Sequence, residues 1–312
     1  MTMRTPKRSH RRAGRDGFVI IAVLWILIAL ATLASIYSIY IGNSALALAV
    51  VDDGLQTEAA VSTSLELTAY RLTLPAKEPP PTRGAFVFRL GRANVAVNFT
   101  SENARLDLNA ASKDMLAGLF AALGAPSEAA DTYADRIIGW RTAPKRGEQA
   151  SEDTLYRTAG RTYLPRGAPF AHVSELWLVH GLPPALIERA LPFVTIYSGK
   201  AEINVFDAPP EVLAALPGMT PARLNSFLDR RESTPREPEA LPLLLGPDQK
   251  GATAEGSDGV RVLVRVSFDN GRKTASEAVI MLGASDAPYR VLSWRDDVDA
   301  GPDRPQAATR RR

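Results

Sequence analysis

The sequence contains no cysteine and only three histidines among its 312 residues. Without thiols, the chain can form neither disulfide bonds nor thiolate metal sites. The histidines are His10, His172 and His180, and no acidic residue stands at a zinc-like spacing from the last two on the same helix. We also find no serine nucleophile elbow, no Gly-rich phosphate loop and no paired-carboxylate motif. These absences argue against an enzyme.

Charge is absent between Gly17 and Val51, where 35 consecutive residues include no Asp, Glu, Lys or Arg. About 20 apolar residues are enough to span a bilayer as a helix. The apolar residues are densest over 18–41, which we predict to be a transmembrane segment. This run is longer than a signal-peptide core, and no convincing A-x-A cleavage site follows its core. The pattern therefore favours a retained anchor over an ordinary secretory signal.

Basic residues are concentrated before this apolar segment. Residues 1–17 carry six of them against Asp16, a net charge of +5, so the formal +3 of the chain leaves −2 for residues 18–312. By the positive-inside rule, the N-terminus lies in the cytoplasm and the bulk of the chain lies across the membrane. Because the exported part is nearly neutral, its net charge gives no sign of the basic surface of a nucleic-acid-binding protein.

Beyond the anchor, residues 52–74 have an amphipathic pattern. Leu55, Ala59, Ala69 and Leu72 belong to a series at three- and four-residue spacing, and no proline occurs before Pro75. We predict one continuous helix over 18–74, whose second half packs on the soluble body.

The junction between Gly17 and Phe18 resembles the cleavage site of a prepilin leader. By that resemblance, residues 1–17 are a leader removed by prepilin peptidase, and Phe18 becomes the N-methylated first residue of the mature chain. Most pilin-like proteins carry Glu at the fifth mature position, whereas this sequence has Ala22. A carboxylate inside an apolar run is costly unless it has a partner. The absence of that carboxylate predicts a different placement of this subunit in a filament.

Two separate regions, 84–100 and 259–295, have the alternation of an antiparallel sheet. The predicted strands are Ala85–Leu90, Asn94–Thr100, Gly259–Phe268, Ser276–Leu282 and Tyr289–Trp294. Gly91-Arg92 joins the first two, and Asp269-Asn270-Gly271 predicts a type I′ hairpin turn between the third and fourth. The predicted fold class is α+β: a pilin-like long N-terminal helix packed on an antiparallel sheet.

A helical domain is predicted between these two parts of the sheet, over 101–231. Its segments Leu106–Ser112 and Ile203–Pro210 each place Asn or Asp ahead of a helix, where such side chains cap free N–H groups. We interpret this large all-α insert as repeated helix–hairpin–helix, SAM-like units. The Pro- and Gly-rich stretch 232–258 is predicted to be a mobile linker, and 296–312 a disordered tail.

Two observations bear on ligands of this insert. DNA-binding hairpins offer backbone N–H groups and basic neighbours to phosphates, but here they read Gly181-Leu182-Pro183 and Gly218-Met219-Thr220, with no Lys or Arg and with a proline that has no N–H. The acidic residues Glu148, Glu152 and Asp153 are weak candidates for a calcium site, because oxygen-rich loops bind calcium. They are few and mixed with basic residues, so calcium stays doubtful and no other cofactor is predicted.

Taken in order, these features resemble the minor pseudopilin K family of the type II secretion system. The resemblance covers most of residues 14–295. It rests on the leader junction, on Ala22, and on insert segments that include Ile137–Arg141 and Pro169–Leu176. Absence of Glu at the fifth mature position is typical of this family member. Some relatives bind calcium after the Trp-Arg position, and this sequence lacks several of the aspartates used there.

The resemblance implies a structural subunit at the tip of the periplasmic pseudopilus, where it helps to initiate assembly and supports export of folded proteins across the outer membrane. The implied partners are minor pseudopilins I and J, prepilin peptidase and the inner-membrane secretion platform. The implied location is the bacterial inner membrane, with a single span and a periplasmic C-terminal domain. The alternative that the residues leave open is a membrane-anchored helix–hairpin–helix DNA-binding protein.

Overall fold

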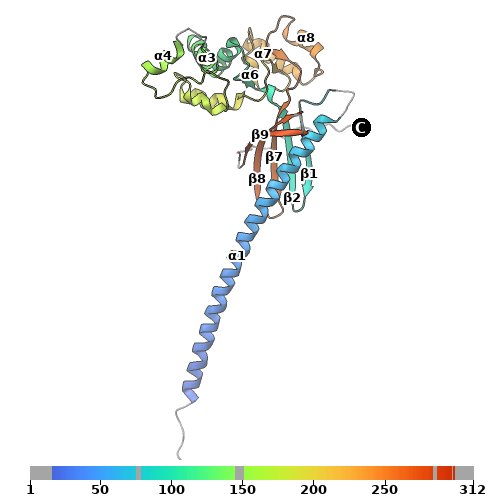
Figure 1. Ribbon diagram of the computed structural model, residues 1–312. Coiled ribbons are helices and arrows are strands. Elements are labelled where there is room, and N and C mark those ends of the chain that lie inside the picture. Colours follow the sequence, from blue (N-terminus) through green and yellow to red (C-terminus); the bar gives the residue numbers. More distant parts are fainter. Residues whose placement is uncertain (1–15, 75–78, 145–150, 284–286, 297, 299–312) are drawn as a thin grey trace, which may run out of the picture. The chain divides into compact units, whose positions relative to one another are not determined.

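The structure is a computed structural model, and it describes residues 16–74, 79–144, 151–283, 287–296 and 298 (Figure 1). The predicted leader therefore lies outside the described residues up to position 15, as does the predicted tail apart from Asp296 and Val298. The chain divides into two compact units, residues 1–58 and residues 59–312. Each is considered by itself.

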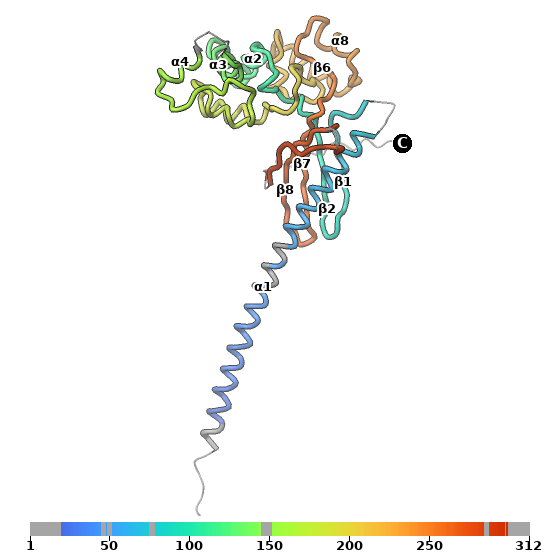
Figure 2. The backbone as a smooth tube through the Cα atoms, in the orientation of Figure 1, coloured from blue at the N-terminus to red at the C-terminus, as the bar shows by residue number. Residues whose placement is uncertain are grey.

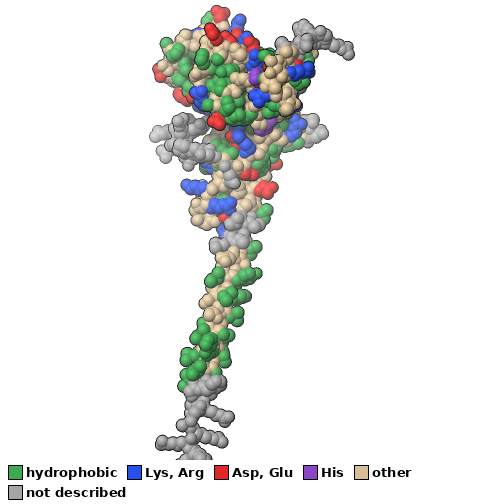
Figure 3. All heavy atoms as spheres, turned by 90° about the vertical axis from the view of Figure 1, so that its left-hand side faces the viewer, with side chains coloured by type: hydrophobic (Ala, Val, Ile, Leu, Met, Phe, Trp, Pro, Cys, Tyr) green, Lys and Arg blue, Asp and Glu red, His purple; other side chains and the backbone are tan. Residues whose placement is uncertain are grey.

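One helix, α1, runs from Asp16 to Thr73 and belongs to both units, which confirms the predicted helix over 18–74. Within the described residues, its stretch Ile20–Ser44 is the one segment long and apolar enough to cross a membrane. Large apolar side chains there are open to the surroundings, and Trp25 is 69% exposed. In the view of Figure 3, hydrophobic side chains lie along this part of α1.

The last turns of α1 pack on the sheet in the second unit. Ala60, Val61, Leu65, Ala69 and Leu72 are buried in one cluster with the valines of the sheet. Two buried polar side chains on this face form hydrogen bonds to carbonyl groups of their own helix. The hydroxyl of Ser64 donates to the carbonyl of Ala60 at 2.6 Å, and the hydroxyl of Thr68 donates to the carbonyl of Ser64 at 2.7 Å. A buried hydroxyl bonded in this way avoids the cost of an unsatisfied polar group.

Five antiparallel strands form the sheet in the order β1-β2-β7-β8-β9. They are β1 Arg83–Leu90, β2 Ala93–Ser101, β7 Gly259–Phe268, β8 Lys273–Leu282 and β9 Tyr289–Arg295. All five predicted strands are present. Strands β2 and β7 are hydrogen-bonded neighbours, with Ser101 opposite Val260, so the chain leaves the sheet after β2 and returns to the adjacent position (Figure 2).

The predicted type I′ turn between β7 and β8 is wrong. Ser267 lies opposite Lys273, and Phe268 donates its N–H to the carbonyl of Arg272, so the loop has three residues. A two-residue Asn-Gly loop would instead pair positions 269 and 272. Gly271 takes a positive φ of 87° as the last residue of this loop, the arrangement of a turn followed by a glycine bulge.

The helical domain comprises residues 102–258, between β2 and β7. Its elements are η1 Glu102–Ala104, β3 Leu106–Asp107, α2 Lys113–Ala122, α3 Ser127–Arg141, α4 Ser151–Thr158, η2 Val173–Leu178, α5 Pro184–Ala190, η3 Leu191–Phe193, β4 Val194–Thr195, β5 Ile203–Asn204, α6 Pro210–Ala214, α7 Pro221–Arg231, η4 Pro238–Ala240, α8 Leu241–Leu245 and β6 Ala252–Thr253. The domain is thus predominantly, but not entirely, helical.

Residues 232–258 belong to this domain, so the predicted linker is wrong. They contain η4, α8 and β6, and Ala240, Leu245 and Ala254 are buried in the core of the domain. Proline and glycine are frequent here because the chain turns often, and Gly246 and Gly251 both take positive φ values. A composition rich in these residues fits compact turns as well as a flexible connection.

The domain contains two units that begin and end alike. In the first, β3 pairs in parallel with β4, and in the second, β5 pairs in parallel with β6. The residue after the first strand then donates its N–H to a threonine carbonyl at the end of its own unit: Leu108 to Thr195, and Val205 to Thr253. The likeness of the two opening segments in the sequence therefore reflects a repeated local structure.

The Asn and Asp side chains of these openings form tight turns and do not cap the helices as predicted. The N–H of Asn109 donates to Asp107 Oδ1 at 2.7 Å, and the N–H of Phe206 donates to Asn204 Oδ1 at 3.0 Å. The side chain that caps α2 belongs to Ser112. These are Asx turns, in which the side chain mimics a backbone turn.

Candidate functional site

The predicted processing site lies at the beginning of α1. Gly17 and Phe18 are the second and third residues of this helix. Both residues precede the membrane-length stretch Ile20–Ser44. Cleavage between Gly17 and Phe18 stays a prediction.

The predicted calcium ligands are not brought together as a set by the described residues. Glu148 lies outside the described residues. Glu152 and Asp153 lie in the first turn of α4, and Glu152 Oε2 accepts a hydrogen bond from Arg136 Nη1 at 2.9 Å. Within the described ranges, no group of three or more His, Asp or Glu side chains could hold a metal ion.

The two predicted hairpins use their polar groups within the domain. Gly181 and Gly218 take positive φ values of 86° and 72°. In the first hairpin, the N–H of His180 donates to the hydroxyl of Tyr156 at 2.7 Å. In the second, Arg223 donates from Nη1 to the carbonyl of Gly218 at 2.7 Å. The guanidinium of Arg223 thus binds the backbone of the hairpin next to it. This contact gives no support to the DNA-binding alternative.

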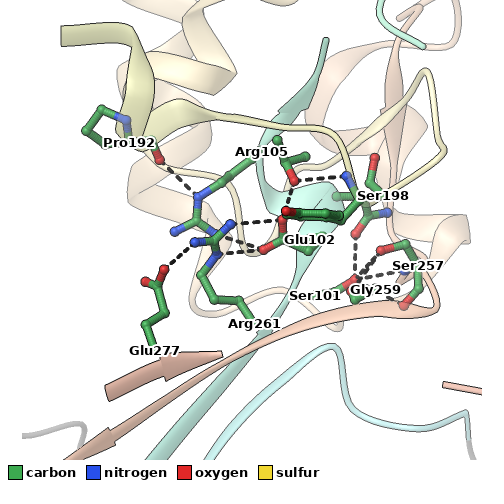
Figure 4. A network of polar contacts seen from close by, with 12 residues as sticks. Ser101, Glu102, Arg105, Pro192, Ser198, Ser257, Gly259, Arg261 and Glu277 are labelled. Atoms are coloured by element: carbon green, nitrogen blue, oxygen red, sulfur yellow. Dashed lines mark hydrogen bonds and ion pairs between the residues drawn. The ribbon is translucent and has the colours of Figure 1, made fainter. Parts of the chain in front are cut away.

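The structure does reveal a polar site that the sequence analysis missed, at the connection between the sheet and the helical domain. Its centre is Glu102, whose side chain is fully buried. Arg261, on β7, donates to both carboxylate oxygens, from Nε at 2.7 Å and from Nη2 at 3.0 Å (Figure 4). Thr195 donates its hydroxyl to the same carboxylate, and Arg105 approaches it at 3.5 Å.

Electrostatics in this site follow from burial and charge. Burial lowers the pKa of Arg105 to about 10, and the neighbouring charge of Arg261 acts in the same direction. Burial would also lower the pKa of Arg261, but hydrogen bonds and attraction from Glu102 and Glu277 outweigh it and raise that pKa. Both guanidinium groups therefore stay charged at neutral pH, and the buried carboxylate of Glu102 has the cations it needs.

A second buried carboxylate, Asp207, connects the other unit of the helical domain to the sheet. Its side chain is fully buried, and Arg83 on β1 approaches it with Nε at 3.3 Å. Arg236 donates to the same oxygen from Nη1 at 2.7 Å. Thr82 and Asn204 donate to the other oxygen. Asp207 lies ahead of a helix, as predicted, but its partners come from positions far apart in the chain.

These contacts join the helical domain to the sheet. The carboxylates of Glu102 and Asp207 both accept hydrogen bonds from arginine and threonine donors, and Asp207 also accepts one from Asn204. The site therefore supports a structural role.

Comparison with known proteins finds a family that part of this chain resembles. Residues 91–199 match the model of the type II secretion system protein K family, in its first domain. The type II secretion system protein K of Pseudomonas aeruginosa is 35% identical over 115 residues, which are 36% of this chain and 34% of that protein. The protein K of Klebsiella pneumoniae is 34% identical over 76 residues, 24% of this chain and 23% of that protein. The aligned part of this chain thus spans about a third of the Pseudomonas relative at most.

The fold extends the likeness beyond the aligned sequence. A chain in the crystal structure of the GspK-GspI-GspJ complex of the enterotoxigenic Escherichia coli type 2 secretion system superposes with a TM-score of 0.54. The match covers 77% of this chain and 94% of that chain, at 18% sequence identity. The α+β fold predicted from the sequence is thereby confirmed. The family model and both relatives therefore agree that part of this chain is similar to the type II secretion system protein K family.

Proposed function

We propose that the protein is a minor pseudopilin of a type II secretion system: a non-enzymatic subunit at the tip of the periplasmic pseudopilus that helps to initiate assembly and supports export of folded proteins across the outer membrane. The observation that carries this proposal is the fold. This chain has a membrane-length N-terminal helix and an antiparallel sheet with a helical insert between neighbouring strands. Over 77% of its length, its fold matches 94% of a chain from a GspK-GspI-GspJ complex.

Export by living cells tests this proposal most directly. Deletion of the gene should abolish secretion of the system's substrates into the medium, with those substrates retained in the periplasm, and the full chain supplied from a plasmid should restore it. A cytoplasmic marker reports lysis. Normal export by the deletion strain, with the remaining secretion genes intact, would overturn the proposal.

The proposed partners are minor pseudopilins I and J and the inner-membrane secretion platform. The basis is the structural match to a chain from a complex named for GspK, GspI and GspJ. Affinity purification of the full chain from detergent-solubilised membranes should recover I and J in fixed proportion when all three are expressed together. Membranes that contain each protein alone, mixed after solubilisation, control for capture by the resin. Recovery of neither pseudopilin from the co-expressing cells would contradict the proposal.

Prepilin peptidase is the proposed processing enzyme, acting between Gly17 and Phe18. Mass spectrometry of the membrane-extracted protein should find a mature N-terminus at N-methylated Phe18. Gly17→Ala should leave much of the chain uncleaved, while Gly14→Ala, the same change three residues earlier, should be processed normally. An intact Met1 terminus in cells with active peptidase would refute the assignment.

The proposed topology is a single span with the N-terminus in the cytoplasm and the C-terminal domain in the periplasm. It rests on the six basic residues before the apolar run and on the membrane-length stretch Ile20–Ser44. In spheroplasts, external protease should degrade the C-terminal domain, and the same protease should spare it in intact cells. Protection in spheroplasts, with a known periplasmic protein degraded, would reverse the orientation.

A further inference from the structure

Two neighbouring segments of chain connect the helical domain to the sheet. The first leaves β2 at Ser101, and the second enters β7 at Gly259. The segments are bonded to each other: the N–H of Ser257 donates to Ser101 Oγ at 2.8 Å, and Asn103 Nδ2 donates to the carbonyl of Glu255 at 2.6 Å. Two adjacent connections without other support would act as a hinge, because a few residues at the ends of elements can absorb a large rotation.

The first obstacle to such a hinge is the buried carboxylate of Glu102. It lies in the first connection and binds both parts at once: Arg261 belongs to the sheet, and Thr195 belongs to the helical domain. Figure 4 shows Arg261 and Arg105 converging on Glu102 from different segments. A rotation that separated Thr195 from Arg261 would leave a buried charge without part of its partners, which is costly.

The second obstacle is Asp207, which lies in the other unit of the helical domain. It binds Arg83, the first residue of β1, and Thr82, which precedes that strand. In the sheet, β1 and β7 lie on opposite sides of β2. The two carboxylates thus hold the domain to different strands, and a single rotation axis through the paired connections cannot preserve both sets of contacts.

Backbone packing at the second connection adds a steric constraint. A Cβ atom at Gly259 would overlap the carbonyl oxygen of Tyr197, a residue of the helical domain. The two main chains therefore meet directly at this point.

From these contacts we propose that Glu102 and Asp207 form a two-point latch that fixes the orientation of the helical domain on the sheet. The domain is then carried as a rigid extension of the sheet, and it does not swing about its paired connections. The latch is a property of this fold and does not rest on the proposed role in secretion.

The absence of cysteine allows a direct test by spin labelling of the full chain in detergent. Labels are attached at Asp131→Cys, exposed on α3, and Lys273→Cys, exposed at the start of β8. Pulsed dipolar spectroscopy of this labelled parent should give a single narrow distance distribution. Adding Arg83→Ala and Arg261→Ala, which remove the arginine that each carboxylate binds on the sheet, should replace it by a broad distribution or several peaks.

Arg89→Ala is the matched control, because Arg89 is an arginine on β1 whose ion pair with Asp269 at 2.7 Å stays within the sheet and its loops. This variant should keep the narrow distribution. Arg83→Ala alone, at a partly exposed position, serves if the double variant does not fold, and it should broaden the distribution to a smaller extent. Circular dichroism checks that each variant is folded. A broad distribution in the labelled parent, or an unchanged narrow one in a folded double variant, would overturn the latch.

Discussion

Gly118 offers a sharp test of how the two units of the helical domain pack together. It lies in α2, and a Cβ atom added there would stand 2.5 Å from the carbonyl oxygen and 2.9 Å from the Cα of Ala215, which follows α6. Both atoms are main chain, so neither can rotate away. The change Gly118→Ala therefore forces the two helices apart.

The magnitude follows from two opposing effects. Over-packing of a tight core costs about 1–3 kcal/mol, and ordinary contact distances are about 0.9 Å longer than the closest one here (3.4 against 2.5 Å). Alanine in place of glycine inside a helix returns roughly 1 kcal/mol. Because the clash is with backbone, we expect a cost at the upper end of this range, about 2–3 kcal/mol, and hence a net loss of about 1–2 kcal/mol in the free energy of unfolding.

Thermal unfolding of the full chain in detergent, followed by near-ultraviolet circular dichroism, measures this loss. The buried aromatic residues Trp140 and Tyr156 report on the helical domain. A loss of this size should lower the midpoint by roughly 2–8 °C.

Gly139→Ala in α3 is the matched control. The added Cβ there would meet the side chain of Glu152 at 2.9 Å, and a side chain can move where a main chain cannot. Its midpoint should fall by less than half as much as that of Gly118→Ala. A Gly118→Ala protein as stable as the parent would refute the tight approach of α2 to the chain after α6.

Three further predictions concern buried polar groups. Asp107→Ala removes an acceptor of four hydrogen bonds and should lower the free energy of unfolding by about 2–4 kcal/mol in chemical denaturation. Asp107→Asn should cost less, since Asn204 holds the equivalent position in the other unit of the helical domain. Equal costs of the two changes would contradict the role of Asp107 as a hydrogen-bond acceptor in this turn. Burial would raise the pKa of Glu277, but the charge of Arg261 helps to bring that pKa below its ordinary value of 4.5. The stability that ionised Glu277 contributes should therefore be present above pH 4.5 and be lost in more acidic solution. Acid titration of the free energy of unfolding should show a flatter decline for Glu277→Gln than for the parent, and an identical decline would contradict this contribution. Burial raises the pKa of Tyr156 from 10.0 to about 12, so the stability that its protonated hydroxyl contributes should be complete below pH 10 and decline towards pH 12. Tyr156→Phe should lower the free energy of unfolding by about 1–3 kcal/mol at neutral pH and remove that decline. A Tyr156→Phe protein as stable as the parent would show that the buried hydroxyl is dispensable.

Periodicity in the sequence was sufficient for the elements whose residues contact near neighbours. The uncharged run from Gly17 and the amphipathic pattern after it predicted α1, because a helix must cover an apolar face wherever it packs or spans. Alternation between Gly259 and Phe268 gave both ends of β7, since successive side chains in a strand point to opposite faces. The interruption of the sheet by a helical insert was also readable, because the two parts differ in period.

Tertiary structure decided what depends on partners distant in sequence. Glu102 and Arg261 are 159 residues apart, so neither residue carries a local sign that it belongs to a buried ion pair. Likewise, residues 232–258 have the composition of a linker, yet Leu245 is buried because the rest of the domain provides a core for it. Asp207 was predicted to cap a helix, but its carboxylate instead forms ion pairs with Arg83 on β1 and with Arg236. The sequence alone determined the long N-terminal helix with its membrane-length anchor and the five strands of the sheet. Only the tertiary structure decided how the helical domain is held on the sheet, because charges and backbone contacts from separate segments meet there only after the chain has folded.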